Sequence, residues 1–291
     1  EEWTDMVRRL RASTEDARPT DLDGRTENLL WQTLWGTWAP DSDDPMTADR
    51  LTAYLIKASR EQKGWTTWSA PDIDREQGLT DYATHLLTDP DTANELNAFA
   101  ALTAKDVSSI ILANKAMTLT WLGVADIYQG SELTRTSLVD PDNRRAVDYD
   151  GEGGLRAMLS QVSAGSSPRT LDQEKLRLTH LLAQLRAERP DTFVGPRSGY
   201  RAIPVTTSHA FAYARLLDEE PDVVVIVRRL GRRLRRLGGW REESVVLPDG
   251  QWTEVLTEQS IDGGAQRLAD VVGDLPVVVL ARDRQAGRAD T

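Results

Sequence analysis

The sequence contains no cysteine and only three histidines, His85, His180 and His209. The lack of cysteine excludes disulfide bonds, thiol catalysis and cysteine-ligated metals, and the histidines are too scattered to form a metal-ligand motif. No run approaches the roughly 20 consecutive apolar residues of a membrane span, and the first residues lack the layout of a signal peptide. We therefore expect a cytoplasmic protein without a bound metal.

Basic residues are also outnumbered, 35 against 46 acidic ones, which gives a formal net charge of −11. Such a charge repels phosphate backbones and argues against general nucleic-acid binding. One segment, RRLGRRLRR at 228–236, is rich in arginine and in isolation is typical of a patch for nucleic acid or anionic lipid. Because apolar runs flank this segment, we interpret it as a solvated connection between strands, and we expect no nucleic-acid or membrane partner.

What the chain does contain fits a soluble globular protein. Its 291 residues are 40% hydrophobic and 28% charged, and they suffice for two compact domains. Tryptophan occurs nine times. Flat indole rings fill cores and also stack on sugar rings, and core packing is the default interpretation of any single one.

Helical periodicity dominates the first third of the sequence. The chain begins inside an amphipathic pattern without a helix cap, which indicates a cut inside a larger protein. Thr47 can cap a helix that ends near Gly64. Apolar stripes at helical spacing lie at Leu51, Tyr54, Leu55 and Ala58, at Leu79, Tyr82, Ala83 and Leu86, and at Val107, Ile110 and Ile111. The pattern predicts a helical subdomain over residues 1–118.

The period changes at Leu119, where LTWLGVADIY is typical of a strand buried on both faces. A helix follows the next polar loop, with its stop at Pro190 and an apolar stripe at Leu178, Leu181, Leu182 and Leu185. One strand and one helix cannot bury each other's faces alone. We therefore interpret residues 119–192 as one βα unit of a larger sheet or barrel.

The last third has strand signals. HAFAYAR alternates, VVVIV and PVVVL are strand runs, and LPDGQW is typical of a turn between two strands. The pattern predicts an antiparallel β-sandwich domain over residues 193–283, followed by a polar tail at 284–291.

The phrases GVADIYQGSEL at 123–133 and SLVDPDNRRAVDY at 137–149 closely resemble the end of the eighth barrel strand and the following loop in maltooligosyltrehalose synthases, of the α-amylase superfamily. Three further stretches agree in order: NLLWQTLWGTW at 28–38, KASREQKGWTTW at 57–68 and LPDGQWTEVLT at 247–257. The resemblance thus covers nearly the whole chain. The chain departs from the family's pattern at Ala125, where proline is usual, and at Trp65, where histidine is usual.

The resemblance implies a (β/α)8 barrel of TIM type, in which residues 1–118 are an insertion between strands 7 and 8 and residues 119–192 supply the last strand, loop and helix. It implies an intramolecular transglucosylation, without a cofactor, that converts the reducing-end α-1,4 link of a maltooligosaccharide to an α,α-1,1 link. Such retaining chemistry uses a nucleophilic carboxylate and a proton donor. The resemblance places these acids upstream of Glu1, so we expect the chain alone to be inactive and to need the N-terminal barrel portion.

Nine residues are candidates for binding the maltooligosaccharide: Lys63, Trp68, Tyr128, Gln129, Glu132, Asp140, Asp142, Arg144 and Arg145. Active sites of such barrels lie at the carboxyl ends of the strands, where Tyr128, Gln129 and Glu132 fall. The alternative for Tyr128 and Glu132 is to hold the loop by hydrogen bonds.

The two acids and two arginines at 140–145 could pair with each other or grip sugar hydroxyls. Lys63 could donate to hydroxyls or interact with a helix dipole, and Trp68 could stack on glucose. A competing hypothesis is a non-catalytic carbohydrate-binding or structural fragment that needs its missing half. A third, an arginine-rich nucleic-acid binder, depends on residues 228–236 alone.

Overall fold

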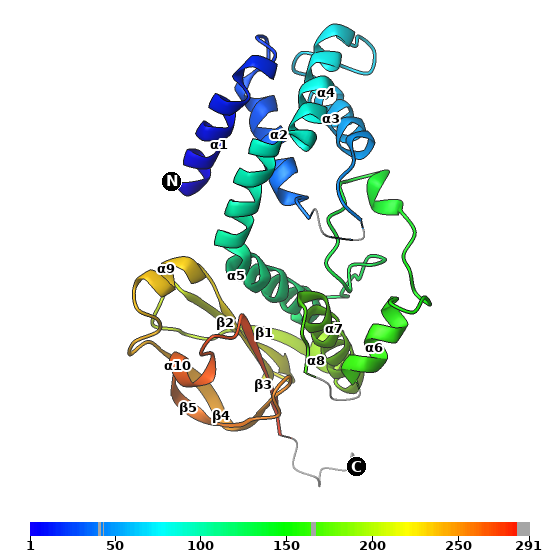
Figure 1. The fold of residues 1–291 in the computed structure, drawn as a ribbon. Helices are drawn as coiled ribbons and strands as arrows, with labels where there is room; N and C mark the ends of the chain where they lie inside the picture. The colour runs from blue at the N-terminus through cyan, green and yellow to red at the C-terminus, as the bar shows by residue number, and fades with distance from the viewer. Residues whose placement is uncertain (40–41, 43, 164–166, 284–291) are drawn as a thin grey trace. The chain divides into compact units, whose positions relative to one another are not determined.

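The computed structural model describes residues 1–39, 42, 44–163 and 167–283. The chain divides into two compact units, each of which can be followed in Figure 1 by its labels. The first unit comprises Glu1–Ala104 and Arg135–Ala146, and the second comprises Lys105–Thr134 and Val147–Thr291. Each unit has a hydrophobic core built from its own residues, so each is described by itself.

The first unit is helical, as the periodicity predicts. Its elements are α1 (Glu2–Ser13), η1 (Glu15–Ala17), α2 (Gly24–Gly36), α3 (Ala48–Gln62), α4 (Ile73–Thr88), the first half of α5 (Pro90–Thr120) and η2 (Asp142–Arg144). The predicted limits of α3 are confirmed. Thr47 caps it by accepting the Arg50 N–H, and Lys63 ends it in the left-handed region at φ 57°.

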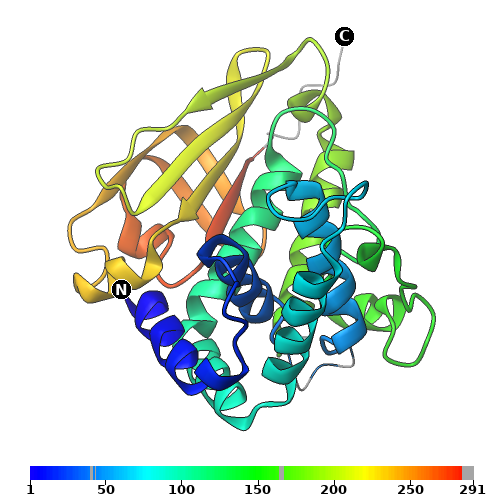
Figure 2. The same ribbon diagram turned by 90° about the horizontal axis from the view of Figure 1, so that it is seen from above.

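The core of this unit forms where the apolar stripes of the helices meet. Leu51 and Leu55 of α3 and Leu79 and Tyr82 of α4 are all buried, and these two helices run side by side in both views (Figures 1 and 2). The Tyr82 ring packs edge-on against Trp31, with 6.2 Å between ring centroids, and its hydroxyl shares a hydrogen bond of 2.8 Å with Thr14. Burying each leucine contributes about 1.5–3 kcal/mol.

The second unit combines helices with one antiparallel sheet. The helices are the second half of α5, α6 (Leu155–Ser163), α7 (Leu171–Glu188), α8 (Pro190–Phe193), α9 (Gly231–Arg236) and α10 (Leu268–Val271). The strands are β1 (Ser198–Ala202), β2 (Ala210–Leu217), β3 (Glu220–Arg228), β4 (Ser244–Glu254), β5 (Ser260–Arg267) and β6 (Val277–Arg282). The strand order is β1-β2-β3-β6-β4-β5.

Both faces of the sheet are covered, which explains the uninterrupted apolar runs of β3 and β6. Side chains alternate along β3, so Val224 and Ile226 face a core that includes Trp252. Val223 and Val225 belong to the opposite core, together with Leu112 of α5 and Leu182 of α7. The antiparallel β-rich prediction is confirmed. The arginine-rich segment does lie between two strands, because it runs from the end of β3 through α9 toward β4, but Leu234 within it is buried in the core.

The strand predicted over residues 119–128 was wrong for this structure. Helix α5 continues to Thr120, and residues 121–134 form turns and irregular backbone. A strand buried on both faces requires neighbouring strands on its two edges. Among the described residues, none of the six strands pairs with this segment.

Two details of the predicted β domain also need correction. The six strands form one continuous hydrogen-bonded sheet, whereas a sandwich has two. The predicted turn at LPDGQW is instead an irregularity inside β4, where the register with β5 shifts between Leu247 and Gln251. Gly250 occupies φ 123° there, a conformation that suits glycine.

Helix α5 is, among the described residues, the one helix long and apolar enough by length and composition to cross a membrane. Those two criteria alone are weak evidence, because a core helix meets them too. Leu96 is buried in the first unit, and Leu112, Ala116 and Leu119 are buried in the second. The helix therefore contributes to both cores.

Candidate functional site

A cavity of about 640 Å³ opens in the first unit between α3 and the loop that carries η2. Four of the predicted substrate residues line it together: Trp68, Asp140, Asp142 and Arg145. The remaining lining residues are Asp49, Arg50, Ala53, Tyr54, Lys57, Val139 and Pro141. The cavity thus has an apolar surface with charged groups around it, which is the usual composition of a small-molecule site.

Helix α3 supplies one wall of the cavity, because one face of the helix packs in the core and another face lines the cavity. Leu51, Leu55 and Ser59 are buried in the helical core. Arg50, Tyr54 and Lys57 follow at spacings of three and four residues and therefore share the face that lines the cavity. The sequence analysis missed Arg50 and Lys57 because polar residues on the outer face of a helix give no distinctive pattern. Their spacing is the one signal that could have found them.

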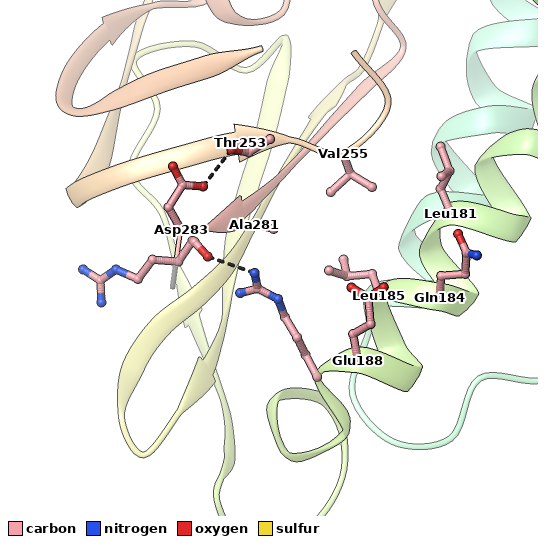
Figure 3. A pocket seen from close by; sticks show the side chains of 10 residues that line it. Leu181, Gln184, Leu185, Glu188, Thr253, Val255, Ala281 and Asp283 are labelled. Carbon is pink, nitrogen blue, oxygen red and sulfur yellow. Dashed lines mark hydrogen bonds between the residues drawn. The ribbon is translucent and has the colours of Figure 1, made fainter. Parts of the chain in front are cut away.

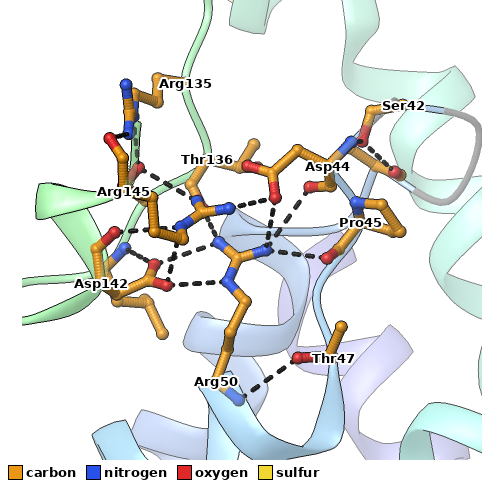
Figure 4. Close-up of polar contacts among 12 residues, drawn as sticks. Ser42, Asp44, Pro45, Thr47, Arg50, Arg135, Thr136, Asp142 and Arg145 are labelled. Atoms are coloured by element: carbon orange, nitrogen blue, oxygen red, sulfur yellow. Dashed lines mark hydrogen bonds and ion pairs between the residues drawn. The ribbon is translucent and has the colours of Figure 1, made fainter. Parts of the chain in front are cut away.

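Asp142 is the centre of an ion-pair network that fixes the second wall (Figure 4). Arg50 binds both carboxylate oxygens, with Nε–Oδ1 at 2.8 Å and Nη2–Oδ2 at 3.0 Å. Arg145 lies 3.1 Å from Oδ1 and donates to the Asp142 carbonyl oxygen, and the Leu138 N–H donates to Oδ2 at 2.8 Å. Arg50 and Asp142 are 12% and 9% exposed at their side chains, so solvent screens this pair little.

The network extends from Asp142 to the segment before α3. Arg145 also pairs with Asp44, and Arg50 donates to the carbonyl oxygens of Pro45 and Thr136 at 2.8 and 3.1 Å (Figure 4). Burial opposes ionisation of Asp142, but hydrogen bonds from Arg50 and Leu138 outweigh it and hold the pKa of Asp142 below its usual value. The donors and acceptors of this group are thus used largely within the protein, where they shape the cavity wall.

Asp140 and Arg144 form a second, more exposed pair at the rim. Arg144 donates to both Asp140 oxygens at 3.0 and 2.8 Å, and this hydrogen bonding lowers the pKa of Asp140. Lys57 approaches from α3 and donates to the Asp140 carbonyl oxygen at 2.8 Å. Asp140 retains 48% exposure at its side chain, so its carboxylate remains reachable from the solvent.

Trp68 presents an exposed aromatic ring to the cavity. Its side chain is among the most exposed large apolar groups, at 59%, and the Arg60 guanidinium lies over the ring at 5.0 Å from its centroid. Arg60 is held by two hydrogen bonds to Glu76, of 2.8 and 2.6 Å. The hydrogen bond from Arg60 is the largest cause that lowers the pKa of Glu76. The ion pair with Glu76 therefore holds the Arg60 guanidinium against the Trp68 ring.

The other predicted residues lie outside this cavity. Lys63 is exposed at the end of α3 and does not line it. Tyr128, Gln129 and Glu132 belong to the second unit, in the segment that follows α5. The structure therefore brings together Trp68, Asp140, Asp142 and Arg145, with Arg144 paired to Asp140, and it places the remaining four elsewhere in the chain.

The second unit has a cavity of its own, of about 570 Å³, between α7 and the ends of β4 and β6 (Figure 3). Leu181 and Leu185 line one side, and Thr253 donates to Asp283 at 2.7 Å on the other. Arg189 donates to the carbonyl oxygen of Arg282 at 2.9 Å. The Arg189 bond thus ties the end of α7 to the sheet. Within the described residues, no three acidic or histidine side chains gather as a metal site would require.

No protein-family profile matches the chain. Two strains of Mycobacterium tuberculosis, CDC 1551 and H37Rv, each have a relative named as a maltooligosyl trehalose synthase. Each is 36% identical over 266 residues, which cover 90% of this chain and 32% of the relative. The chain therefore spans about a third of the length of the curated relatives that it matches.

Solved structures agree with these relatives. The maltooligosyltrehalose synthase of Arthrobacter ramosus is 29% identical, with a TM-score of 0.75 over 88% of this chain and 32% of that one. The crystal structure of a hypothetical maltooligosyl trehalose synthase from Sulfolobus tokodaii is 25% identical, with a TM-score of 0.71 over 97% of this chain and 35% of that one. The resemblance that the sequence motifs indicate is confirmed.

Proposed function

We propose that this chain, which is related to about a third of a maltooligosyltrehalose synthase, forms part of such an enzyme. The enzyme would convert the reducing-end α-1,4 link of a maltooligosaccharide to an α,α-1,1 link by intramolecular transglucosylation, in the cytoplasm and without a cofactor. One observation carries the proposal: the cavity of the first unit combines the exposed indole of Trp68 with the exposed carboxylate of Asp140, groups that can pack on a sugar ring and accept hydrogen bonds from its hydroxyls.

The residues at this cavity would divide the work of binding. Trp68 would stack on a glucose ring through its exposed face, and Asp140 with Arg144 would bind hydroxyl groups at the rim. Asp142 and Arg145 would act through the shape of the loop, because their polar atoms are engaged with Arg50 and with each other. Lys57 belongs with this group, since its ammonium reaches the Asp140 backbone.

The remaining candidates would contribute from other parts of the chain. Tyr128, Gln129 and Glu132 would approach the sugar from the end of a barrel strand, and Lys63 would donate from the end of α3. In the complete enzyme, residues 1–118 would form the insertion between strands 7 and 8. Residues 121–128 would become the eighth strand once neighbouring strands are available to pair with it.

Breaking the glycosidic link needs a nucleophile and a proton donor roughly 5 Å apart across the bond. We assign these acids to the part of the enzyme that this chain does not align with. The chain would accordingly act together with the N-terminal barrel portion, whether on one polypeptide or two.

A split-enzyme experiment tests this proposal. The part of the Mycobacterium tuberculosis relative that does not align with this chain is produced separately, mixed with the chain and incubated with maltopentaose. We expect loss of reducing ends in the mixture and none with either polypeptide alone, since a 1,1 link has no free reducing end. Reducing ends lost to the chain by itself would contradict our assignment of the acids. A mixture that forms a folded complex and still leaves the reducing ends unchanged would contradict the proposed activity.

A second candidate is a carbohydrate-binding fragment without catalytic activity. It is favoured by the position of the cavity, which is built entirely from residues of the first unit. Calorimetric titration of the chain with maltopentaose separates the two functions: binding without complementation favours the fragment, and complementation favours the enzyme.

A further inference from the structure

The segment that leaves α5 and carries Tyr128, Gln129 and Glu132 is gripped by charged side chains from two helices of the second unit. On the α7 side, Lys175 Nζ donates to the carbonyl oxygen of Leu133 at 2.7 Å. Asp172, one helical turn earlier, accepts the N–H of Thr134 at 2.6 Å. The N-terminal part of α7 therefore binds consecutive backbone groups of the segment, one through Lys175 and one through Asp172.

Helix α5 reaches the same segment from another side. Lys115 is 7% exposed, and its Nζ lies 3.4 Å from the Ser131 hydroxyl. Glu132 belongs to the same segment, and its Oε2 is buried and has no hydrogen-bond partner among the described residues. Its charge acts on both lysines. The two ammonium groups therefore offset the charge of a carboxylate whose buried Oε2 has no donor.

We propose that Lys175, together with Lys115 and Asp172, is a positioning clamp that holds residues 128–134 and thereby presents Tyr128 and Gln129 to the sugar. The presentation of side chains to the sugar rests on the proposed function, whereas the hold on residues 128–134 does not. The clamp grips the segment at Ser131, Leu133 and Thr134, within a few residues of each side chain that it presents. Loss of the grip would leave those side chains on a free loop, and small displacements of this kind lower turnover.

The charges around Lys175 give the clamp a measurable pH dependence. Burial and the charge of Lys115 lower the pKa of Lys175 to about 8, against the opposing charges of Asp172 and Glu132. Opening the segment returns Lys175 to water, where its pKa is near 10.4. The closed state thus binds this proton more weakly than the open state, so raising the pH from 8 toward 10 favours closure.

Hydrogen exchange on the full 291-residue chain tests the clamp without any partner or sugar. Four proteins are compared: wild type, Lys175→Met, Lys175→Arg and the matched control Lys105→Met, an exposed lysine of α5 in the same unit. We expect Lys175→Met to lower protection of the Leu133 and Thr134 amides by about tenfold relative to the amides of β3, because a hydrogen bond to a charged group is lost. Lys175→Arg should restore much of it, and Lys105→Met should match wild type.

The pH arm uses the same proteins, with rates corrected for intrinsic exchange. Protection of residues 131–134 should rise between pH 8 and pH 10 in wild type and stay constant in Lys175→Arg, since arginine keeps its charge over this range. Equal acceleration in the segment and in β3 on Lys175→Met would overturn the clamp, because the lysine would then support the whole unit. Unchanged protection in that variant would overturn it as well.

The split-enzyme mixture tests the link to function. With maltopentaose, Lys175→Met should lower kcat by about tenfold while Lys105→Met leaves it unchanged. If the wild-type mixture has no activity, the proposed function fails, and the exchange measurements still decide whether the clamp exists. If the exchange result is as expected and Lys175→Met turns over at the wild-type rate, the clamp stands as a local feature and its role in presenting side chains is refuted.

Discussion

Replacing Arg50 with methionine should destabilise the helical unit, and the loss can be worked out from its contacts. The substitution keeps a side chain of similar length but removes both bonds to Asp142 and the bonds to the Pro45 and Thr136 carbonyl oxygens. Breaking a buried pair by removing one partner costs about 3–5 kcal/mol when the remaining charge has no other support. Asp142 keeps Arg145 and the Leu138 N–H, so we expect a loss of about 2–3 kcal/mol.

Tryptophan fluorescence in a urea titration is a suitable assay. Trp31 and Trp35 lie in the core of this unit or pack against it, together with Trp3, Trp38 and Trp65, so the transition reports largely on the helical unit. The slope of the free energy of unfolding against denaturant should not change, because the variant loses contacts without altering the surface exposed on unfolding.

The double variant Arg50→Met with Asp142→Asn decides whether the orphaned charge is the cause. Removing the carboxylate charge as well should recover part of the loss, since no unpaired ion then remains buried. A loss below about 0.5 kcal/mol for Arg50→Met alone, or a double variant whose loss equals the sum of both singles, would refute this reasoning.

Three further predictions concern other parts of the chain. Trp68→Ala should weaken maltopentaose binding by about threefold to tenfold with little change in thermal stability. Ile73 is equally exposed, and Ile73→Ala should change neither binding nor stability. Equal effects of the two variants on binding would contradict the stacking role of Trp68. Glu76→Gln should destabilise the helical unit at neutral pH, because the pKa of Glu76 is lowered in the folded protein. The stabilisation is present above the unfolded pKa, near 4.3, and is lost as the pH falls through the folded pKa. A difference in unfolding free energy between wild type and variant that is the same at pH 3 as at pH 7 would contradict this prediction. Gly263→Ala should destabilise the sheet by about 2 kcal/mol in calorimetry, since the added Cβ would lie 2.5 Å from the Pro248 carbonyl oxygen and 2.8 Å from the Asp249 Cα. Gly153→Ala, whose added Cβ meets nothing within 4 Å, should be nearly neutral. Comparable melting temperatures for the two variants would count against this prediction.

Helices and strands could be predicted wherever the apolar residues followed a single pattern, either helical spacing or a strand run. The stripe at Leu51 and Leu55, bounded by Thr47 and Gly64, indicated α3 almost to the residue, because capping and amphipathic spacing agreed. The valine run of β3 was equally clear. Single-sheet topology could not be obtained in this way, since pairing partners depend on contacts between β3 and β6 that are far apart in sequence.

The candidate site could be predicted only on the side that carries a distinctive phrase. The acids and arginines of residues 140–145 stood out because four charges occur within six positions. Arg50 and Lys57 did not, since an exposed charge on a helix is ordinary, and their importance comes from the loop that folds against them. Whether Asp142 binds a ligand or a protein group is decided by its neighbours in space.

The segment after α5 shows why an apolar pattern can be a sound signal and still give the wrong element. The run LTWLGVADIY is apolar enough for a strand buried on both faces, but burial has to come from neighbours. In this chain Leu122, Val124 and Tyr128 are 52%, 86% and 46% exposed, and the helix absorbs the residues up to Thr120. Apolar side chains so exposed gain nothing from the fold that surrounds them. The helix continues to Thr120 because tertiary contacts favour it there: Leu119 and Thr120 are buried, and the Thr120 hydroxyl shares a hydrogen bond of 2.6 Å with the Tyr213 hydroxyl. An apolar run therefore reports that burial is available, and the neighbours that provide the burial decide which element forms.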